Sequence, residues 1–236
     1  MRLTAPALVA ALLFASTTGT AAQTPSTAKP PTDIYHVHLT KAAPGQADAL
    51  GKSLSQPDPT SPMPDHFIVL RHQEGDDWDY AVIQHLGQKA TVAITPAPAA
   101  TAPVLAVSHT DSFVSGPSWP DFTREMGIGG TAKPGAIYVL GLHRAVPGHR
   151  AQLEQILNQP AARDAKIMTG TVFLQHLEGS DWQYLGITRY DSWGDFAAAQ
   201  TAAAAAGAAA PGGWGDVRMH SASHHDTIAD RIYPIK

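Results

Sequence analysis

The chain has 236 residues and a formal net charge of −4, with 16 Lys and Arg against 20 Asp and Glu. This mildly acidic balance argues against nucleic acid as a partner, because proteins that bind it carry a basic patch or stripe. Cysteine is absent, which excludes thiol catalysis, thiolate-bound zinc and iron–sulfur clusters, whereas histidine is unusually frequent with 12 residues.

Residues 1–22 have the pattern of a secretory signal peptide. Arg2 supplies the positive charge, Ala5–Ala15 forms the apolar core, and small residues precede a cleavage point at Gln23. We therefore expect an exported protein, in the bacterial periplasm or secreted, with a flexible leader over residues 23–32. The apolar core is too short to span a bilayer and no later segment is long enough, so no membrane span is expected.

The following residues predict a short series of strands and one helix. Alternating side chains predict a strand over Ile34–Leu39, and Pro44 and Gly45 precede an amphipathic helix. Four prolines within residues 55–65 predict a loop. A β-hairpin, Phe67–Gln73 and Tyr80–Leu86, comes next, and residues 104–113 predict a closing strand or the end of a short helix.

The hairpin occurs twice in the chain. The segment His66–Leu86 matches Gly170–Tyr190, which repeats its His, Glu, Gly, Asp, Trp and Tyr residues at the same spacing. The strand Ile34–Leu39 matches Ile137–Leu142 in the same way. These matches predict a tandem duplication, with a first half at residues 33–113, a Gly- and Pro-rich linker at 114–135 and a second half at 136–236.

Each half has the predicted order β–α–β–β–(α)–β, which is that of a ferredoxin-like unit. On this element order, the chain resembles the dimeric α+β barrel superfamily with both halves in one chain. The resemblance implies an α+β fold in which two antiparallel sheets form an intrachain barrel with a ligand cavity between them. Members of that superfamily include small monooxygenases, isomerases, cyclases, dehydratases and haem-binding enzymes, so the resemblance implies no single reaction.

His36 and His38 are the main candidates for catalytic residues. Both lie on the same face of the strand Ile34–Leu39, whose other face is apolar. We expect the apolar face to pack on helices and the two imidazoles to point into the space between the sheets. There they could act as acid and base, coordinate one metal ion, or form hydrogen bonds in a polar layer without a catalytic role. The second half has Val139 and Gly141 at the matching positions, and Gly141 would leave room for a ligand.

Further candidates for ligand binding are His109, Tyr80, Tyr184 and His224. The two histidines each precede an aspartate by two residues, and the two tyrosines could line the mouth of the barrel. No metal site is assigned from the sequence, but a helix over residues 214–226 would place His220 and His224 one turn apart, a spacing that suits a metal ion. His72, His176 and the tryptophans of the repeated hairpin are interpreted as structural.

The leading hypothesis is an exported protein that binds a small apolar organic molecule, with His36 and His38 supporting isomerase, lyase or cofactor-free oxygenase chemistry. One alternative is a haem- or transition-metal-binding protein, although no specific motif identifies a cofactor. The other is a binding or interaction module without catalysis. A small-molecule ligand is the expected partner, and the sequence is compatible with a monomeric barrel or a homodimer.

Overall fold

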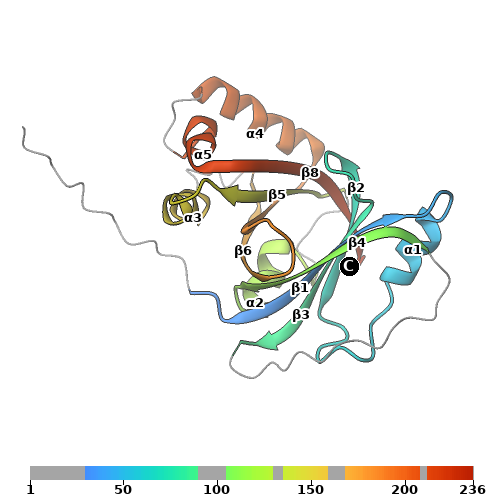
Figure 1. The fold of residues 1–236 in the computed structure, drawn as a ribbon. Helices are drawn as coiled ribbons and strands as arrows, with labels where there is room; N and C mark the ends of the chain where they lie inside the picture. The colour runs from blue at the N-terminus through green and yellow to red at the C-terminus, as the bar shows by residue number, and fades with distance from the viewer. Residues whose placement is uncertain (1–29, 90–104, 130–134, 159–167, 208–211, 236) are drawn as a thin grey trace, which may run out of the picture.

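A computed structural model describes residues 30–89, 105–129, 135–158, 168–207 and 212–235. The predicted signal peptide and most of the predicted leader lie outside these residues. The chain forms eight strands and five helices within the described part, in an α+β arrangement (Figure 1). The strands are β1 (Asp33–Ala42), β2 (Phe67–Glu74), β3 (Tyr80–Gln88), β4 (Ala106–Gly116), β5 (Ile137–Ala145), β6 (Gly170–Glu178), β7 (Tyr184–Tyr190) and β8 (Ser221–Tyr233).

All eight strands form one closed antiparallel barrel in the order β1-β3-β2-β8-β5-β7-β6-β4. The prediction of two separate sheets therefore needs correction. Strands β4-β1-β3-β2 of residues 33–116 have the same order as β8-β5-β7-β6 of residues 137–233, which are called the first and second half below. Pairing of β2 with β8 and of β4 with β6 joins the halves and leaves no open sheet edge.

Apolar side chains from every strand occupy the interior of the barrel. Tyr35, Val37 and Leu39 of β1 meet their counterparts Tyr138 and Leu140 of β5 in one core cluster. A narrow crevice in this core does not admit a water molecule; it is lined by Leu39, Trp78, Leu140, Leu142, Leu185 and Thr227. Burial of these side chains is the main stabilising contribution to the barrel.

Four helices lie outside the barrel: α1 (Ala47–Leu54), α3 (Arg150–Asn158), α4 (Trp193–Ala206) and α5 (Trp214–His220) (Figure 1). Leu50 of α1 packs on Phe67 and Tyr80, and Leu153 of α3 packs on Tyr184. Each of these helices covers only part of the outer surface. The remaining outer positions of the strands can therefore carry polar side chains.

The fifth helix, α2 (Trp119–Met126), lies within the segment that was expected to be a linker. Ser118 caps its first turn by accepting a hydrogen bond from the backbone N–H of Asp121, and Gly127 ends it in the left-handed region with φ 66°. Phe122 and Met126 enter the barrel core, so α2 closes one end of the barrel. The glycine and proline content concealed a short helix whose stability comes from its caps and this burial. No helix in the described residues has the length and apolar character needed to cross a membrane.

Candidate functional site

His36 and His38 lie on the outer face of the barrel, not in its interior. Their neighbours Tyr35, Val37 and Leu39 belong to the barrel core, so strand alternation directs the two imidazoles outward. The prediction that they line a cavity between the sheets was wrong. The more apolar face of β1 occupies the closed interior because it is covered on all sides there, whereas helices cover the outer face only in part.

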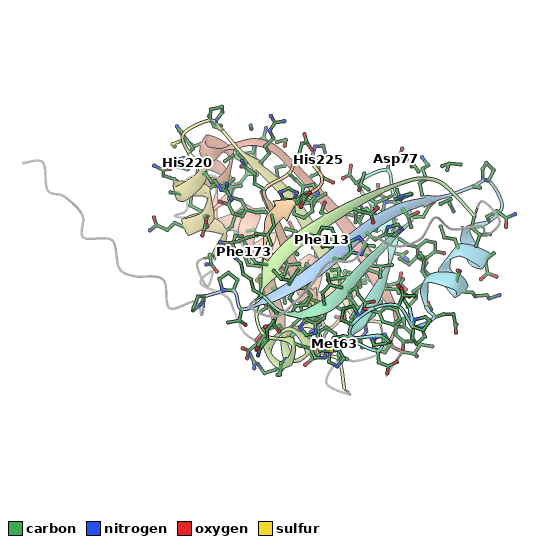
Figure 2. All side chains as sticks on the ribbon, turned by 60° about the horizontal axis from the view of Figure 1, so that its bottom comes forward. Met63, Asp77, Phe113, Phe173, His220 and His225 are labelled. Atoms are coloured by element: carbon green, nitrogen blue, oxygen red, sulfur yellow. The ribbon has the colours of Figure 1, made fainter. Side chains whose placement is uncertain are left out.

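The two imidazoles meet an aspartate from the adjacent strand. β1 pairs with β4, and His38 lies directly opposite Asp111 in this ladder. Nε2 of His36 and Nδ1 of His38 each lie 2.8 Å from the same oxygen, Oδ1 of Asp111. These two nitrogens and one oxygen, which are all potential metal ligands, lie within 4.8 Å of one another. Figure 2 shows the outer side of β1 and β4, with Phe113 labelled on β4; its ring stacks on His36 at 5.3 Å.

A third imidazole completes this group, which we call the first cluster: His36, His38, His109 and Asp111. Nε2 of His109 lies 3.3 Å from the second carboxylate oxygen of Asp111, and its ring lies 5.2 Å from that of His38. Hydrogen bonds from His36 and His38 hold the pKa of Asp111 well below its usual range. The side chains are partly open to solvent, at 30% for His36, 21% for His38 and 42% for Asp111, so an ion or small molecule can reach them.

The second half carries a related group on β5 and β8, which we call the second cluster: His143, His224 and Asp226. The β5–β8 ladder pairs Gly141 with Asp226 and His143 with His224, at the positions where the first half pairs His38 with Asp111 and Thr40 with His109. Nε2 of His224 lies 2.9 Å from Oδ1 of Asp226. Burial, together with the neighbouring His224, lowers the pKa of His143 to about 4. Sequence analysis did not identify His143, although it follows Gly141 by two residues and therefore faces the same side.

His220 and His224 do not form the predicted pair on a helix. Helix α5 ends at His220, and β8 begins at Ser221 because the chain pairs there with β5. His220 instead lies next to His149, with 2.9 Å between their Nδ1 atoms. Pairing of β8 with β5 therefore makes His224 part of a strand and not of a helix, and it brings His224 beside His143 in the second cluster.

Tyr80 and Tyr184 do not line the mouth of the barrel. Both are buried beneath helices on its outer face. The hydroxyl of Tyr80 donates to the carbonyl of Ala47 in α1 at 2.7 Å, and that of Tyr184 lies 3.0 Å from Glu154 in α3. Their role in the structure is to attach helices to the outer face of the barrel.

The repeated hairpin packs in the same way in both halves. His72 contacts Trp78 edge-on with 5.7 Å between ring centroids, and His176 contacts Trp182 at 5.1 Å. The turn glycine of each hairpin lies against the opposite half: a Cβ atom on Gly75 would overlap the backbone of Asp226, and one on Gly179 would overlap that of Asp111. Each hairpin therefore supports the strand that carries the aspartate of the other half.

Two further histidines, His85 and His66, form a contact near α2 that is separate from both clusters. Nε2 of His85 lies 2.9 Å from Oδ2 of the buried Asp33, and its Nδ1 lies 3.1 Å from Nδ1 of His66. Trp119 stacks on both rings, and its backbone N–H donates to Asp33. Burial lowers the pKa of His85. These contacts connect β1, β3 and the start of α2.

No protein-family model matches this sequence, and a search of curated proteins finds no match. Two solved structures are similar. A protein described as "anthrone oxidase-like protein" aligns with 86% of this chain and 92% of its own, with a TM-score of 0.52 and 12% identity. A "putative monooxygenase from Lactobacillus acidophilus NCFM" aligns with 85% of this chain and 94% of its own, with a TM-score of 0.47 and 8% identity.

At 12% identity, the likeness to the anthrone oxidase-like protein concerns the fold alone. It agrees with the α+β barrel architecture that the sequence predicted, and it extends over most of both chains. The chemistry of this protein has to be argued from its own residues, and the first cluster offers the most convergent set of donor atoms in the described part of the chain.

Proposed function

We propose that this protein binds a divalent transition metal ion at the first cluster, through Nε2 of His36, Nδ1 of His38 and a carboxylate oxygen of Asp111. The observation that carries this proposal is the convergence of these three atoms within 4.8 Å. Imidazole and carboxylate together suit zinc, copper, nickel and iron. The proposal takes an ion and not haem, because haem iron receives its protein ligands along one axis whereas these three atoms converge from one side.

The geometry of the strands favours this set. Residues two apart on a strand share a face and lie about 7 Å apart along it, and the residue opposite on the next strand lies on the same face. Asp111 is therefore close to both imidazoles without any loop rearrangement. The side chains are partly exposed, which leaves positions around a bound ion free for water or substrate.

We further propose that the bound ion supports oxygenase-type chemistry on a small organic molecule. Two histidines and one carboxylate with open positions is the ligand set of non-haem iron oxygenases. The fold of the anthrone oxidase-like protein agrees with an oxygenase, and its name makes anthrone the first compound to test. His109, whose Nε2 lies 3.3 Å from the outer oxygen of Asp111, would orient the carboxylate ligand.

A second candidate function is supported by the hydrogen bonds of Asp111. A carboxylate that accepts from two imidazoles fixes their orientation and increases their basicity. His36 and His38 could then act as acid and base on a small molecule without a metal ion, as in an isomerase, lyase or cofactor-free oxygenase.

The proposal also includes a tandem duplication and export of the protein from the cytoplasm. The matching strand orders of the two halves and their matching hairpins support a tandem duplication of a ferredoxin-like unit. The pattern of residues 1–22 supports export to the periplasm or outside the cell.

The test is metal content and oxygen use of untagged protein. After removal of bound metals and reloading with Fe²⁺, Zn²⁺ or Cu²⁺, we expect His38→Ala to lose one equivalent of metal relative to wild type, measured by elemental analysis after gel filtration. His225→Ala is the matched control, because His225 is exposed and outside the first cluster. Oxygen consumption by the Fe²⁺ form with anthrone tests the chemistry. If His38→Ala retains full metal content but loses turnover of a substrate, metal-free acid–base chemistry is the better account.

A further inference from the structure

The second half has lost the equivalents of His36 and His38, yet it retains an imidazole and carboxylate group at the same place on the outer face. Val139 and Gly141 occupy the two lost positions, while His143 takes the position of Thr40. His224 and Asp226 match His109 and Asp111 in the two ladders. The second half has therefore kept a histidine–aspartate group through different residues.

Gly141 leaves a narrow opening in the middle of this group, in which even a Cβ atom would crowd its neighbours. A Cβ atom at Gly141 would lie 3.0 Å from Oδ1 of Asp226 and 3.0 Å from Nε2 of His143, so both atoms border the volume that a side chain would fill. Nε2 of His224 lies 2.9 Å from the same carboxylate oxygen. In the first half, the corresponding position carries the ring of His38. The opening is thus bordered by a carboxylate oxygen of Asp226 and Nε2 of His143, and Nε2 of His224 lies beside the same carboxylate oxygen.

Burial of His143 is unfavourable for the stability of the fold, so packing alone does not explain why this residue is a histidine. Its exposed fraction is 6%, and Nδ1 is buried without a hydrogen-bond partner among the described residues. Burial of a polar atom without a hydrogen-bond partner destabilises the folded state. Its ring stacks on His224 with 4.4 Å between centroids and 13° between planes. Nε2, in contrast, faces the space beside Gly141, so it is the nitrogen of His143 that a ligand could reach.

We infer that His143, His224 and Asp226 form a site for a divalent transition metal ion over Gly141, separate from the site proposed at the first cluster. This group is wider than the first cluster, which is the group of the described residues whose potential ligand atoms all lie within 4.8 Å of one another. The Asp226 side chain is 53% exposed, so its carboxylate can turn toward His143 to close the site. The inference stands on these contacts alone and holds whether or not the first cluster binds metal.

The experiment is the stoichiometry of Co²⁺ binding to untagged, metal-depleted protein, measured by calorimetry and by elemental analysis after gel filtration. Wild type should bind two equivalents. Asp226→Asn should bind one, Asp111→Asn should bind one, and the double variant should bind none. Asp226 is on the surface, so Asp226→Asn tests the site without the risk that replacement of buried His143 disrupts folding.

A pair of glycine variants supplies a matched control. Gly141→Ala fills the opening without removing a donor, and we expect it to lose the second equivalent of Co²⁺. Gly186→Ala adds the same methyl group directly opposite on β7, where a Cβ atom would meet nothing within 4 Å, and should retain two equivalents.

Each outcome decides between the two sites. A single equivalent in wild type that Asp226→Asn leaves intact overturns this inference and supports the first cluster alone. A single equivalent that Asp226→Asn removes and Asp111→Asn leaves intact supports the second site and contradicts the proposed function. Two equivalents in Gly141→Ala also overturn the inference, because the opening would then have no part in binding.

Discussion

His38 lies directly opposite Asp111 across the β1–β4 ladder, with 2.8 Å between Nδ1 and Oδ1. His36 reaches the same oxygen from two residues away, so one carboxylate joins two imidazoles of a single strand. His109 reaches only the other oxygen, at 3.3 Å. This division separates residues that would touch a bound ion from one that would orient its ligand.

Replacement of His109 tests that division. We expect His109→Ala to lower the affinity of the first cluster for Co²⁺ by about 10-fold, because loss of a partner that orients a metal ligand costs 10–100-fold. Removal of a ligand in His36→Ala should lower it further, by about 100-fold or more. Calorimetric titration measures both, and equal losses in the two variants would make His109 a ligand.

Gly179→Ala, a change in the second half, should lower the stability of the fold and displace Asp111 of the first cluster. Gly179 has φ 118°, and a Cβ atom there would overlap the backbone of Asp111, so we expect a loss of about 2 kcal/mol or more in unfolding free energy. Displacement of Asp111 should also weaken metal binding at the first cluster.

Gly148→Ala is the control for the effect of backbone conformation. Gly148 has φ 85° but nothing within 4 Å of its Cβ position, so this variant should lose only about 1 kcal/mol and keep its affinity. Urea unfolding and metal titration of both variants make the comparison. If Gly179→Ala binds metal as wild type does, the hairpin does not position Asp111.

Tyr80→Phe should affect stability and leave binding unchanged. The hydroxyl of Tyr80 donates to the carbonyl of Ala47 in α1, and loss of this hydrogen bond should lower the unfolding free energy by about 1 kcal/mol. Affinity for Co²⁺ should equal that of wild type, since Tyr80 is buried under α1 and belongs to neither cluster. A marked change in affinity would restore the ligand-binding role that the sequence had suggested.

Acid should weaken the contact between β3 and α2. Burial lowers the pKa of His85 in the folded state, so the unfolded chain binds more protons as the pH falls below about 6.5. Stability linked to His85 is therefore complete above that pH and is lost as the pH falls toward its folded pKa. An NMR titration of the His85 ring should give a pKa below 6.5, and a value at or above 6.5 would contradict the assignment. Urea unfolding between pH 8 and 5 should show the matching decrease.

Cleavage of the predicted signal peptide should determine the mass of the mature protein. Expressed with its full N-terminus in a bacterial host, the protein should be recovered from the periplasmic fraction starting at Gln23, because the signal pattern ends at Ala22. Intact mass spectrometry of that fraction is the measurement. Recovery of the uncleaved chain from the cytoplasm alone would rule out the signal peptide.

Alternation and repetition predicted much of the barrel. The duplicated hairpin and the matching strands Ile34–Leu39 and Ile137–Leu142 correspond to β2–β3, β6–β7, β1 and β5. Alternation correctly grouped His36 with His38, because side chains two apart on a strand share a face. It could not say which face turns inward, since that depends on closure of the barrel and on where helices cover it.

The partners of the histidines could not be predicted for a related reason. The register of β1 against β4 brings His38 opposite Asp111, and these residues are 73 positions apart in the chain. Register depends on pairing across the whole sheet. His143 was missed because attention to the residues at the positions of His36 and His38 reveals only Val139 and Gly141 in the second half. The imidazole of the second half stands instead at the position of Thr40.

The glycine turns of the two hairpins have a consequence for when the clusters can form. Gly75 lies against Asp226 and Gly179 against Asp111, so the aspartate of each half is backed by a turn from the other. Within each half the ladder already brings the aspartate beside its imidazoles, and the turn from the other half adds support to the backbone of that aspartate. The backbone beneath each aspartate is therefore fully enclosed only when the two halves have joined, so the final rigidity of each cluster depends on closure of the barrel.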